Sequence, residues 1–428
     1  MRRRKTGWVW TAWMMAAILF LGAGTDSTGS PFVPANQTVE EEAKKQEPAQ
    51  KQEPDLGLHS QSAVLMDGKT GRVLYGKEEK LQRPMASTTK IMTCILALEK
   101  GDLGDLVKVS GNAASQPKVH MGMKEGETYY LEDLLYALML ESYNDAAVAI
   151  AEHIGTTVEG FADMMNEKAK SLGCRQTCFI TPNGLDAKEE GEDGKTKIHS
   201  TTAEDLARIM AYCVLESPEK ENFLKITKTR NYSFSDTQKT KQIACVNHNA
   251  FLDMDKDLLS GKTGFTGGAG YSYVAAEETD GRLFTIALLG CGWPPDKTWK
   301  WADARKLFEY GKENFFYRDV YQKTKLPEIP VKEGIPQSSN LTETAAVSLF
   351  SEGKEEFQVL LKEGEEVEIT LGLPQTLSAP IEEGMQVGEI LYTLNGKIIR
   401  KDPVRTAHSV KKITPFWCFL WVLGQYIL

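Results

Sequence analysis

Three short stretches of this sequence combine hydroxyl, amine and amide groups in spacings that suit nucleophilic catalysis. They are Ser87-Thr-Thr-Lys90, Ser142-Tyr-Asn144 and Lys262-Thr-Gly264. Ser87 opens a predicted helix, and a residue three positions further along a helix lies one turn away on the same face. A serine hydroxyl is a weak nucleophile until a base takes its proton, which a neutral lysine amine beside it can do. The first stretch therefore predicts an activated serine.

Each pattern alone is weak evidence, because the chain contains further copies. The other S-x-x-K, S-x-N and K-T-G copies begin at Ser115, Ser217, Ser351, Ser409, Ser110, Ser338 and Lys69. Prolines interrupt the first two copies, the next two lie in or beyond a C-terminal β-rich region, and the copies at Ser110 and Lys69 fit turns. Ser142 instead separates two helical runs, and Lys262 begins a strand followed by a Gly-rich turn. The ordered set is therefore a strong joint signal.

This ordered triplet is the one found in β-lactamases and penicillin-binding proteins. The chain resembles the low-molecular-mass penicillin-binding proteins, which are serine-type D-Ala-D-Ala carboxypeptidases of peptidase family S11. Further stretches carry the resemblance, namely Gly184-Leu-Asp186, His199 to Ala207, Lys262 to Tyr271 and Ala379 to Gly388. The resemblance implies that the protein removes the terminal D-alanine from peptidoglycan stem pentapeptides through an acyl-enzyme, and that β-lactams inhibit it covalently. No cofactor is expected.

The expected catalytic residues are Ser87, Lys90, Ser142 and Lys262. Ser87 Oγ is expected to attack the penultimate D-Ala carbonyl while Lys90 accepts its proton. Burial and the nearby charge of Lys262 favour the neutral amine that this step requires. Ser142 relays a proton to the leaving amine, and Lys262 polarises that relay.

The expected substrate-binding residues are Asn144, Thr263, Gly264, Phe265 and Thr266. Asn144 is expected to hydrogen-bond the substrate amide. Thr263 and Thr266 are expected to donate their hydroxyls to the terminal carboxylate, assisted by Lys262. Backbone N–H groups of Ser87 and, by resemblance, Phe265 are expected to stabilise the oxyanion.

The sequence departs from the family pattern in one respect. Family members often carry an arginine after the last sheet strand, where this chain offers Lys297 or Lys300. Lysine lacks the bidentate fork of arginine, so carboxylate recognition at this place is left open. His199 is expected to anchor a loop rather than to take part in catalysis. Asp186 and Asp205 are expected to accept loop hydrogen bonds or to start helices.

The same motifs also occur in proteins with other functions. A class A β-lactamase would need an E-x-x-L-N segment whose glutamate activates water, and none lies between Ser142 and Lys262. A weak transpeptidase differs only in its acyl acceptor and stays open. The alternative of another class is a non-catalytic wall-binding or penicillin-sensing protein, which the three intact motifs disfavour.

The apolar periodicity predicts an α+β fold, in which an antiparallel sheet is covered by a helical lobe. The expected strands are two around a turn in Ser62–Tyr75, then Lys262–Thr266, Tyr271–Ala276 and Arg282–Leu289, and the expected helices are Ser87–Lys100, Leu131–Leu140, Asp145–Ile154, Val158–Leu172 and Trp301–Phe316. Short alternating runs at Phe357–Leu361, Val367–Leu371 and Glu389–Leu394, separated by Gly-containing turns, predict a small separate β-rich domain.

The two ends of the chain indicate export. A basic start, an apolar run from Trp8 to Ala23 and a small-residue exit are typical of a secretory signal peptide. The uncharged stretch Ile413–Leu428 would span about 24 Å as a helix, short of the roughly 30 Å of a bilayer core. It predicts a shallow membrane-associating tail, with a helix docked on the folded protein as the alternative. The expected location is the outer face of the cytoplasmic membrane or the cell wall.

Composition sets the remaining limits. The chain has 428 residues, is 25% charged and has a formal net charge of −9, which disfavours a nucleic-acid partner. Its length suggests two or three domains. Its seven cysteines cannot all pair, a Cys174–Cys178 bond is left open, and no Cys/His cluster has zinc spacing, so no metal is expected. The expected parts are a signal peptide (1–24), a flexible linker (25–55), a penicillin-binding transpeptidase-like catalytic domain (56–316), a β-rich domain (317–406) and the tail (411–428).

Overall fold

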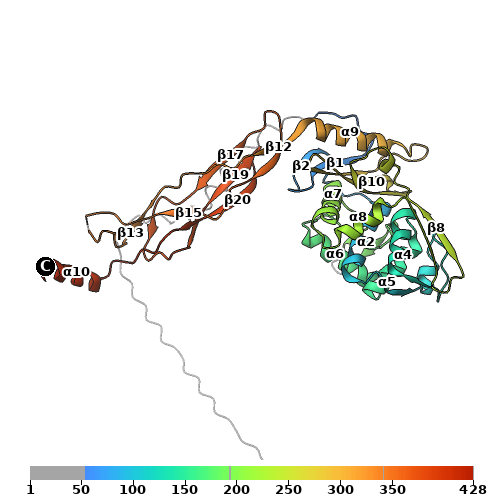
Figure 1. Cartoon of the computed structure of the whole chain (residues 1–428), viewed down its shortest axis with the longest axis horizontal. Helices are drawn as coiled ribbons and strands as arrows, with labels where there is room; N and C mark the ends of the chain where they lie inside the picture. The colour runs from blue at the N-terminus through green and yellow to red at the C-terminus, as the bar shows by residue number, and fades with distance from the viewer. Residues whose placement is uncertain (1–53, 192–193, 341, 428) are drawn as a thin grey trace, which may run out of the picture. The chain divides into compact units, whose positions relative to one another are not determined.

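The computed structural model describes residues 54–191, 194–340 and 342–427 (Figure 1). The expected signal peptide (1–24) and nearly all of the expected linker (25–55) lie outside the described residues. The fold is α+β, as predicted, with a mixed α and β domain followed by a β-rich domain.

A five-stranded antiparallel sheet forms the centre of the first domain, in the order β2-β1-β11-β10-β9. The strands are β1 (Ser62–Asp67), β2 (Val73–Lys77), β9 (Leu258–Thr266), β10 (Gly270–Thr279) and β11 (Arg282–Leu289). Successive side chains of β1 alternate between the two faces. Val64 and Met66 belong to one apolar cluster, whereas Ala63 and Leu65 belong to another. Both faces of the sheet are therefore covered.

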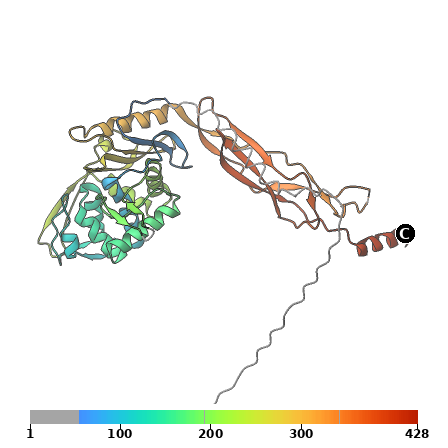
Figure 2. The same cartoon turned by 180° about the vertical axis from the view of Figure 1, so that it is seen from behind.

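Helix α9 (Trp299–Asn314) packs on one face, and a helical lobe packs on the other (Figures 1 and 2). The lobe contains η1 (Ala86–Thr89), α2 (Lys90–Lys100), α3 (Gly111–Ala114), α4 (Leu131–Tyr136), η2 (Ala137–Glu141), α5 (Asn144–Gly155), α6 (Val158–Ser171), α7 (Ala203–Ala211), η3 (Tyr212–Glu216) and α8 (Lys220–Lys228). The short η4 (Ala250–Asp253) packs with α9 on the other face of the sheet. Three short hairpins accompany the lobe, β3-β4 (Leu106–Lys108, Thr128–Tyr130), β5-β6 (Lys188–Glu190, Thr196–Ile198) and β7-β8 (Asn231–Ser235, Gln242–Val246).

Most expected elements agree with the structure within two residues, and the differences are local. The helix expected over Leu131–Leu140 ends in the wider π-helical turn η2. The helix expected over Trp301–Phe316 ends at Asn314, because Phe315 and Phe316 already pair with β16 (Gln358–Lys362) as the start of β12 (Phe315–Asp319).

The β-rich domain contains three small sheets, β12-β16, β14-β13-β18 and β15-β20-β19-β17. Its other strands are β13 (Ile329–Lys332), β14 (Ala346–Val347), β15 (Leu349–Ser351), β17 (Val367–Gly372), β18 (Leu377–Ser378), β19 (Gln386–Leu394) and β20 (Lys397–Thr406). The turn between β19 and β20 is Asn395-Gly396, with φ of 50° and 75°. Positive φ at both positions is what a tight hairpin needs, and Asn-Gly tolerates it.

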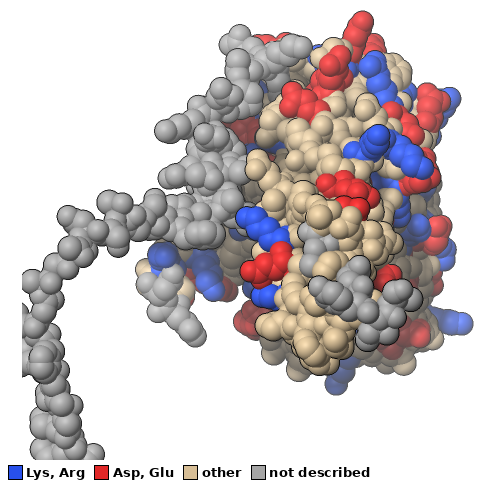
Figure 3. Space-filling model, turned by 90° about the vertical axis from the view of Figure 1, so that its left-hand side faces the viewer, with Lys and Arg blue, Asp and Glu red and all other residues tan. Residues whose placement is uncertain are grey.

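The C-terminal helix α10 (Pro415–Ile427) exposes several large apolar side chains. Phe416 is 71% exposed and Phe419 60%. Within the described part of the chain, no helix combines the length and apolar character that crossing a membrane requires. On the face shown in Figure 3, acidic and basic side chains are interspersed. All seven cysteines are free, so Cys174 and Cys178 are not bonded to each other.

Candidate active site

The nucleophile motif lies on a 3-10 turn that runs directly into a helix. Ser87 is in η1, and Lys90 begins α2. The predicted proximity is present, since Lys90 Nζ lies 3.0 Å from Ser87 Oγ. Ala86, just before Ser87, has φ of 49°, in the left-handed region that alanine rarely adopts.

Lys90 is fully buried and forms no ion pair among the described residues. Its Nζ also lies 2.9 Å from Asn144 Oδ1 and 2.6 Å from the carbonyl oxygen of Asn183. Burial, reinforced by the charge of Lys262 and opposed by that of Asp145, lowers the pKa of Lys90 well below its usual value. A neutral amine has two N–H groups and one lone pair. The two carbonyl oxygens can only accept, so both N–H groups are used there and the lone pair faces Ser87 Oγ.

The second motif lies between two helices. Ser142 follows the π-helical turn η2 in a left-handed conformation, with φ of 64°. Its Oγ is buried and has no hydrogen-bond partner among the described residues. Asn144 begins α5 and is 4% exposed, and its Nδ2 donates to the carbonyl of Pro117. Its Oδ1 accepts from Lys90, and the hydrogen bond that Asn144 is expected to form with the substrate amide stays a prediction.

The third motif lies on the edge strand β9, which packs against η1. Lys262 is 3% exposed, and its Nζ donates to the carbonyl of Thr263 at 3.1 Å. Burial lowers the pKa of Lys262 to about 7, against the opposing charge of Glu141. A Cβ at Gly264 would lie 2.9 Å from the backbone nitrogen of Ser87, so only glycine allows this approach.

The other expected substrate-binding residues lie further along β9. Phe265 is 43% exposed, and its ring lies 4.7 Å from that of Tyr271. Thr266 is expected to donate its hydroxyl to the terminal carboxylate of the substrate. In the structure, Thr266 Oγ1 donates to the side-chain carboxylate of Asp186 at 3.0 Å.

The residues with expected structural roles have them. Nδ1 of His199 accepts from the backbone nitrogens of Ile180 and Thr181 at 3.0 and 3.3 Å. Asp205 accepts from the backbone nitrogen of Gln176 and from the hydroxyl of Thr177. Both residues therefore anchor loops.

Among the described residues, Lys300 forms no hydrogen bond with the motif side chains, but it packs on Tyr271, the strand partner of Phe265. It is 7% exposed, and its Nζ donates to the carbonyl of Lys297. Aromatic rings flank the ammonium, with the centroid of Tyr271 at 4.7 Å and that of Trp301 at 4.6 Å. Burial lowers the pKa of Lys300 to about 8. Lys300 is thus already partnered within the protein.

Sequence reasoning missed two contributors to the site. Asn183 supplies the carbonyl that holds Lys90, and the turn Pro182-Asn-Gly184 signalled only a bend. Glu141, next to Ser142, accepts from the backbone nitrogen of Val246 and pairs with His248 at 2.7 Å. Charge beside the motif was the available signal for Glu141.

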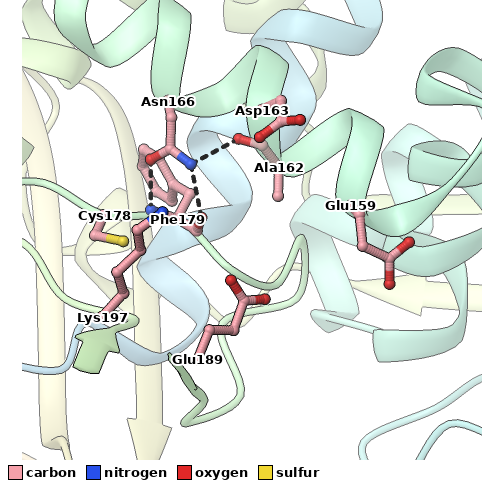
Figure 4. Close-up of a pocket in the computed structure, with 8 residues that line it drawn as sticks. All are labelled: Glu159, Ala162, Asp163, Asn166, Cys178, Phe179, Glu189 and Lys197. Atoms are coloured by element: carbon pink, nitrogen blue, oxygen red, sulfur yellow. Dashed lines mark hydrogen bonds between the residues drawn. The ribbon is translucent and has the colours of Figure 1, made fainter. Parts of the chain in front are cut away.

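A pocket lies beside the segment that leads to Asn183 (Figure 4). Its lining residues are Glu159, Ala162, Asp163, Asn166, Cys178, Phe179, Glu189 and Lys197. Asn166 clamps this segment to α6, because its side-chain amide exchanges two hydrogen bonds with the backbone of Phe179, each 2.8 Å long. None of the expected catalytic side chains lines this pocket. The pocket is therefore separate from the three motifs, and Asn166 in its wall holds the segment that leads to Asn183.

Comparison with known proteins agrees with this geometry. Residues 46–290 match the family model for D-alanyl-D-alanine carboxypeptidase (peptidase S11), and residues 346–412 match the C-terminal domain of penicillin-binding protein 5. D-alanyl-D-alanine carboxypeptidase DacF of Bacillus subtilis is 30% identical over 365 residues, covering 84% of this chain and 87% of the relative.

Two solved structures are similar to this one. Penicillin-binding protein 5 from Haemophilus influenzae has a TM-score of 0.64 at 26% identity, covering 84% of this chain and 99% of that one. Penicillin-binding protein D2 from Listeria monocytogenes, solved in a cefotaxime-bound form, has a TM-score of 0.51 at 25% identity, covering 60% of this chain and 98% of that one.

Proposed function

Because the chain belongs to the D-alanyl-D-alanine carboxypeptidase family, peptidase S11, we propose that it removes the terminal D-alanine from peptidoglycan stem pentapeptides and that β-lactams acylate the same serine. The observation that supports this most is the fully buried Lys90, whose Nζ lies 3.0 Å from Ser87 Oγ without a carboxylate partner among the described residues. A buried amine in this state is a base at neutral pH.

In the acylation step, Ser87 Oγ forms a bond to the penultimate D-Ala carbonyl carbon, and its proton passes to Lys90 Nζ. The carbonyl oxygen becomes an oxyanion, which the backbone N–H groups of Ser87 and Phe265 stabilise. The C–N bond then breaks, Lys90 Nζ gives its new proton to Ser142 Oγ, and Ser142 passes its own hydroxyl proton to the leaving D-Ala amine. The unpartnered hydroxyl of Ser142 is suited to such a relay, because it has no competing hydrogen bond among the described residues.

Substrate recognition is assigned to the residues around β9. Lys262 in its protonated form, with the hydroxyl of Thr263, binds the terminal carboxylate. Thr266 contributes by fixing Asp186 and the end of the strand, since its hydroxyl is used there. Gly264 lets the strand approach Ser87, and Asn144 orients Lys90 and hydrogen-bonds the substrate amide. Water then attacks the ester carbonyl, which releases the shortened peptide and returns Ser87 Oγ to its hydroxyl form.

The test is release of D-alanine from a diacetyl-Lys-D-Ala-D-Ala peptide, with and without an added amine. Release without incorporation of the amine supports the carboxypeptidase, whereas amine incorporation would favour the transpeptidase. Rapid hydrolysis of a chromogenic cephalosporin would favour a β-lactamase. Binding of penicillin with no turnover of any peptide would favour the penicillin-sensing protein. In each assay Ser87→Ala is expected to abolish the reaction and the covalent label.

We propose further that residues 1–24 direct export and that residues 411–428 associate with the membrane surface. The exposed rings of Phe416 and Phe419, close to Lys411 and Lys412, support surface association with acidic lipids. Co-sedimentation of the full chain with anionic vesicles, lost when residues 411–428 are deleted, is the expected result. Equal sedimentation of both proteins would contradict it.

A further inference from the structure

His199 is buried near the nucleophile turn but touches none of the reacting atoms. It is 1% exposed, and both ring nitrogens have partners. Nδ1 accepts from the backbone nitrogens of Ile180 and Thr181, while Nε2 lies 2.9 Å from Thr89 Oγ1. A nitrogen that accepts from two N–H groups carries no proton, so the proton of the neutral ring is on Nε2. Burial, with a smaller effect of the charge of Lys90, lowers the pKa of His199 to about 4, consistent with a neutral ring.

The direction of the next hydrogen bond then follows. Thr89 Oγ1 accepts from Nε2 of His199, and its single hydroxyl hydrogen is donated to the carbonyl oxygen of Ala86 at 2.9 Å. The series of hydrogen bonds runs from the loop through His199 and Thr89 to the residue before Ser87. We call it the His199–Thr89 relay.

The relay ends on a peptide unit whose conformation needs support. Ala86 has φ of 49°, a region that costs alanine roughly 1 kcal/mol or more unless its surroundings enforce it. Gly184 packs against the same carbonyl so closely that a Cβ there would lie 2.0 Å from the oxygen. The orientation of the Ser87 backbone is therefore fixed by the loop on one side and by Thr89 on the other.

The other end of the relay reaches the general base. The loop whose N–H groups bind His199 continues to Asn183, and the carbonyl of Asn183 accepts from Lys90 Nζ at 2.6 Å. That carbonyl is one of the two acceptors that leave the lone pair of Lys90 facing Ser87. One histidine thus joins the backbone that orients the nucleophile to the backbone that orients the base.

We propose that His199 and Thr89 are positioning residues for the acylation step. They fix the position of the Ser87 turn relative to the Asn183 carbonyl that binds Lys90. The proposal rests on the proposed role of Ser87 as nucleophile. Displacements well under 1 Å between reacting groups are enough to slow a step about tenfold.

The primary test compares Thr89→Val with Thr89→Ser. Valine keeps the shape of threonine but leaves the Ala86 carbonyl and the His199 Nε2–H without their partner, whereas serine keeps the hydroxyl. The measurement is the rate constant for acylation by a fluorescent penicillin, expressed per competent site from the burst amplitude. We expect a loss of about tenfold for Thr89→Val, with KM for the peptide unchanged and Thr89→Ser within about twofold of wild type.

A second pair of variants keeps the test usable where Thr89→Val folds poorly. Asparagine at 199 can replace the Nδ1 acceptor but not the Nε2 donor, so His199→Asn breaks the same link from the other side. It is expected to slow acylation about as much as Thr89→Val, and the double variant is expected to be no slower than either, because both remove one connection. Independent effects that multiply in the double variant would overturn the relay.

The outcomes separate this inference from the proposed function. If wild-type protein takes a label at Ser87 and Thr89→Val is labelled equally fast, the relay is rejected and the proposed function stands. If wild-type protein takes no label at Ser87, the proposed function fails and the relay fails with it. A slowed Thr89→Val that Thr89→Ser does not rescue would also reject the hydroxyl as the group responsible.

Discussion

The catalytic lysines on the lobe side of the central sheet and the partly exposed Lys312 on the α9 side have different partners, and their pKa values move in opposite directions. On the lobe side, Lys90 and Lys262 have amide and carbonyl partners but form no ion pair among the described residues, and burial lowers the pKa of both. On the α9 side, Lys312 lies 2.9 Å from Glu277 Oε1 and 3.3 Å from Asp255 Oδ2. Burial alone would lower the pKa of Lys312, but the hydrogen bond and charge of Glu277 raise it.

The difference shows how the same side chain is made reactive or inert. A carboxylate at hydrogen-bond distance keeps the ammonium charged and suits a structural role. Carbonyl oxygens that accept hydrogen bonds without compensating the charge allow burial to favour the neutral amine. Partner chemistry and burial together set the direction of these pKa shifts, and Lys300 of α9, which is buried without a carboxylate partner among the described residues, has a lowered pKa like the lobe lysines.

The largest change in the acylation rate is expected from Lys90→Arg, because this substitution replaces the neutral amine on the lobe side by a permanently charged group. A guanidinium stays protonated in proteins and cannot accept the proton of Ser87. Acylation should slow by about a thousandfold, within the range that general bases contribute. Stopped-flow acylation with a check of the folded state by circular dichroism measures this, and acylation at the wild-type rate would reject Lys90 as the base.

Breaking the ion pair on the α9 side should affect stability and not chemistry. Lys312→Met leaves Glu277, which is fully buried, without its cation. We expect a loss of about 2 kcal/mol in the free energy of unfolding, below the usual cost of breaking a buried pair because Lys312 is partly exposed. Denaturant titration measures this cost.

The matched control is the Lys312→Met, Glu277→Gln double variant, which should recover part of the loss. Acylation per competent site should equal that of wild type in both proteins. A slowed acylation in Lys312→Met would mean that the two faces are coupled and that the comparison between them does not hold.

Glu141 offers a finer test, because its charge opposes the effect of burial on Lys262. The pKa of Lys262 is lowered to about 7 and would be lower without Glu141. The protonated lysine binds the substrate carboxylate, so activity should fall as pH rises through that pKa. In Glu141→Gln the cation is lost at lower pH, and the alkaline limb of the kcat/KM profile should move to lower pH.

At pH 7 the Glu141→Gln variant should lose about threefold in kcat/KM, the size expected when a group titrates near the assay pH. His248, which faces Glu141, provides the control, since His248→Gln keeps the Glu141 carboxylate and should leave the alkaline limb near its wild-type position. A Glu141→Gln profile that coincides with wild type would show that Glu141 does not set the charge of Lys262.

The smallest effect is expected at Lys300, the lysine that could stand in for the family arginine. Its ammonium is already occupied by the carbonyl of Lys297 and by two aromatic rings. Lys300→Gln should change KM for the peptide by less than about threefold, because an ammonium that does not bind the substrate carboxylate directly contributes little to substrate affinity. A tenfold increase in KM would indicate that Lys300 binds the terminal carboxylate of the substrate.

Sequence patterns predicted the elements of this site better than its contacts. The spacing of Ser87 and Lys90 and the placement of Lys262 on a strand follow from local periodicity, and the structure has both. The contact of the Asn183 carbonyl with Lys90 and the effect of Glu141 on Lys262 come from tertiary packing, which local sequence does not encode. Thr266 shows the same limit, because a hydroxyl in a binding motif gave no indication that Asp186 would accept from it.

The β-rich domain was predicted from alternation and turn residues, and those local rules are enough for hairpins such as β19-β20. The short strands β14 and β18 were not predicted, because two residues carry no readable period and pair only through β13.

Covalent mapping of the wild-type protein after reaction with benzylpenicillin addresses the proposed chemistry with a single experiment. Intact mass should rise by one penicilloyl group, and peptide sequencing should place that group on the hydroxyl of Ser87. An unmodified protein, or an adduct on any other side chain, would contradict the whole assignment of nucleophile and base.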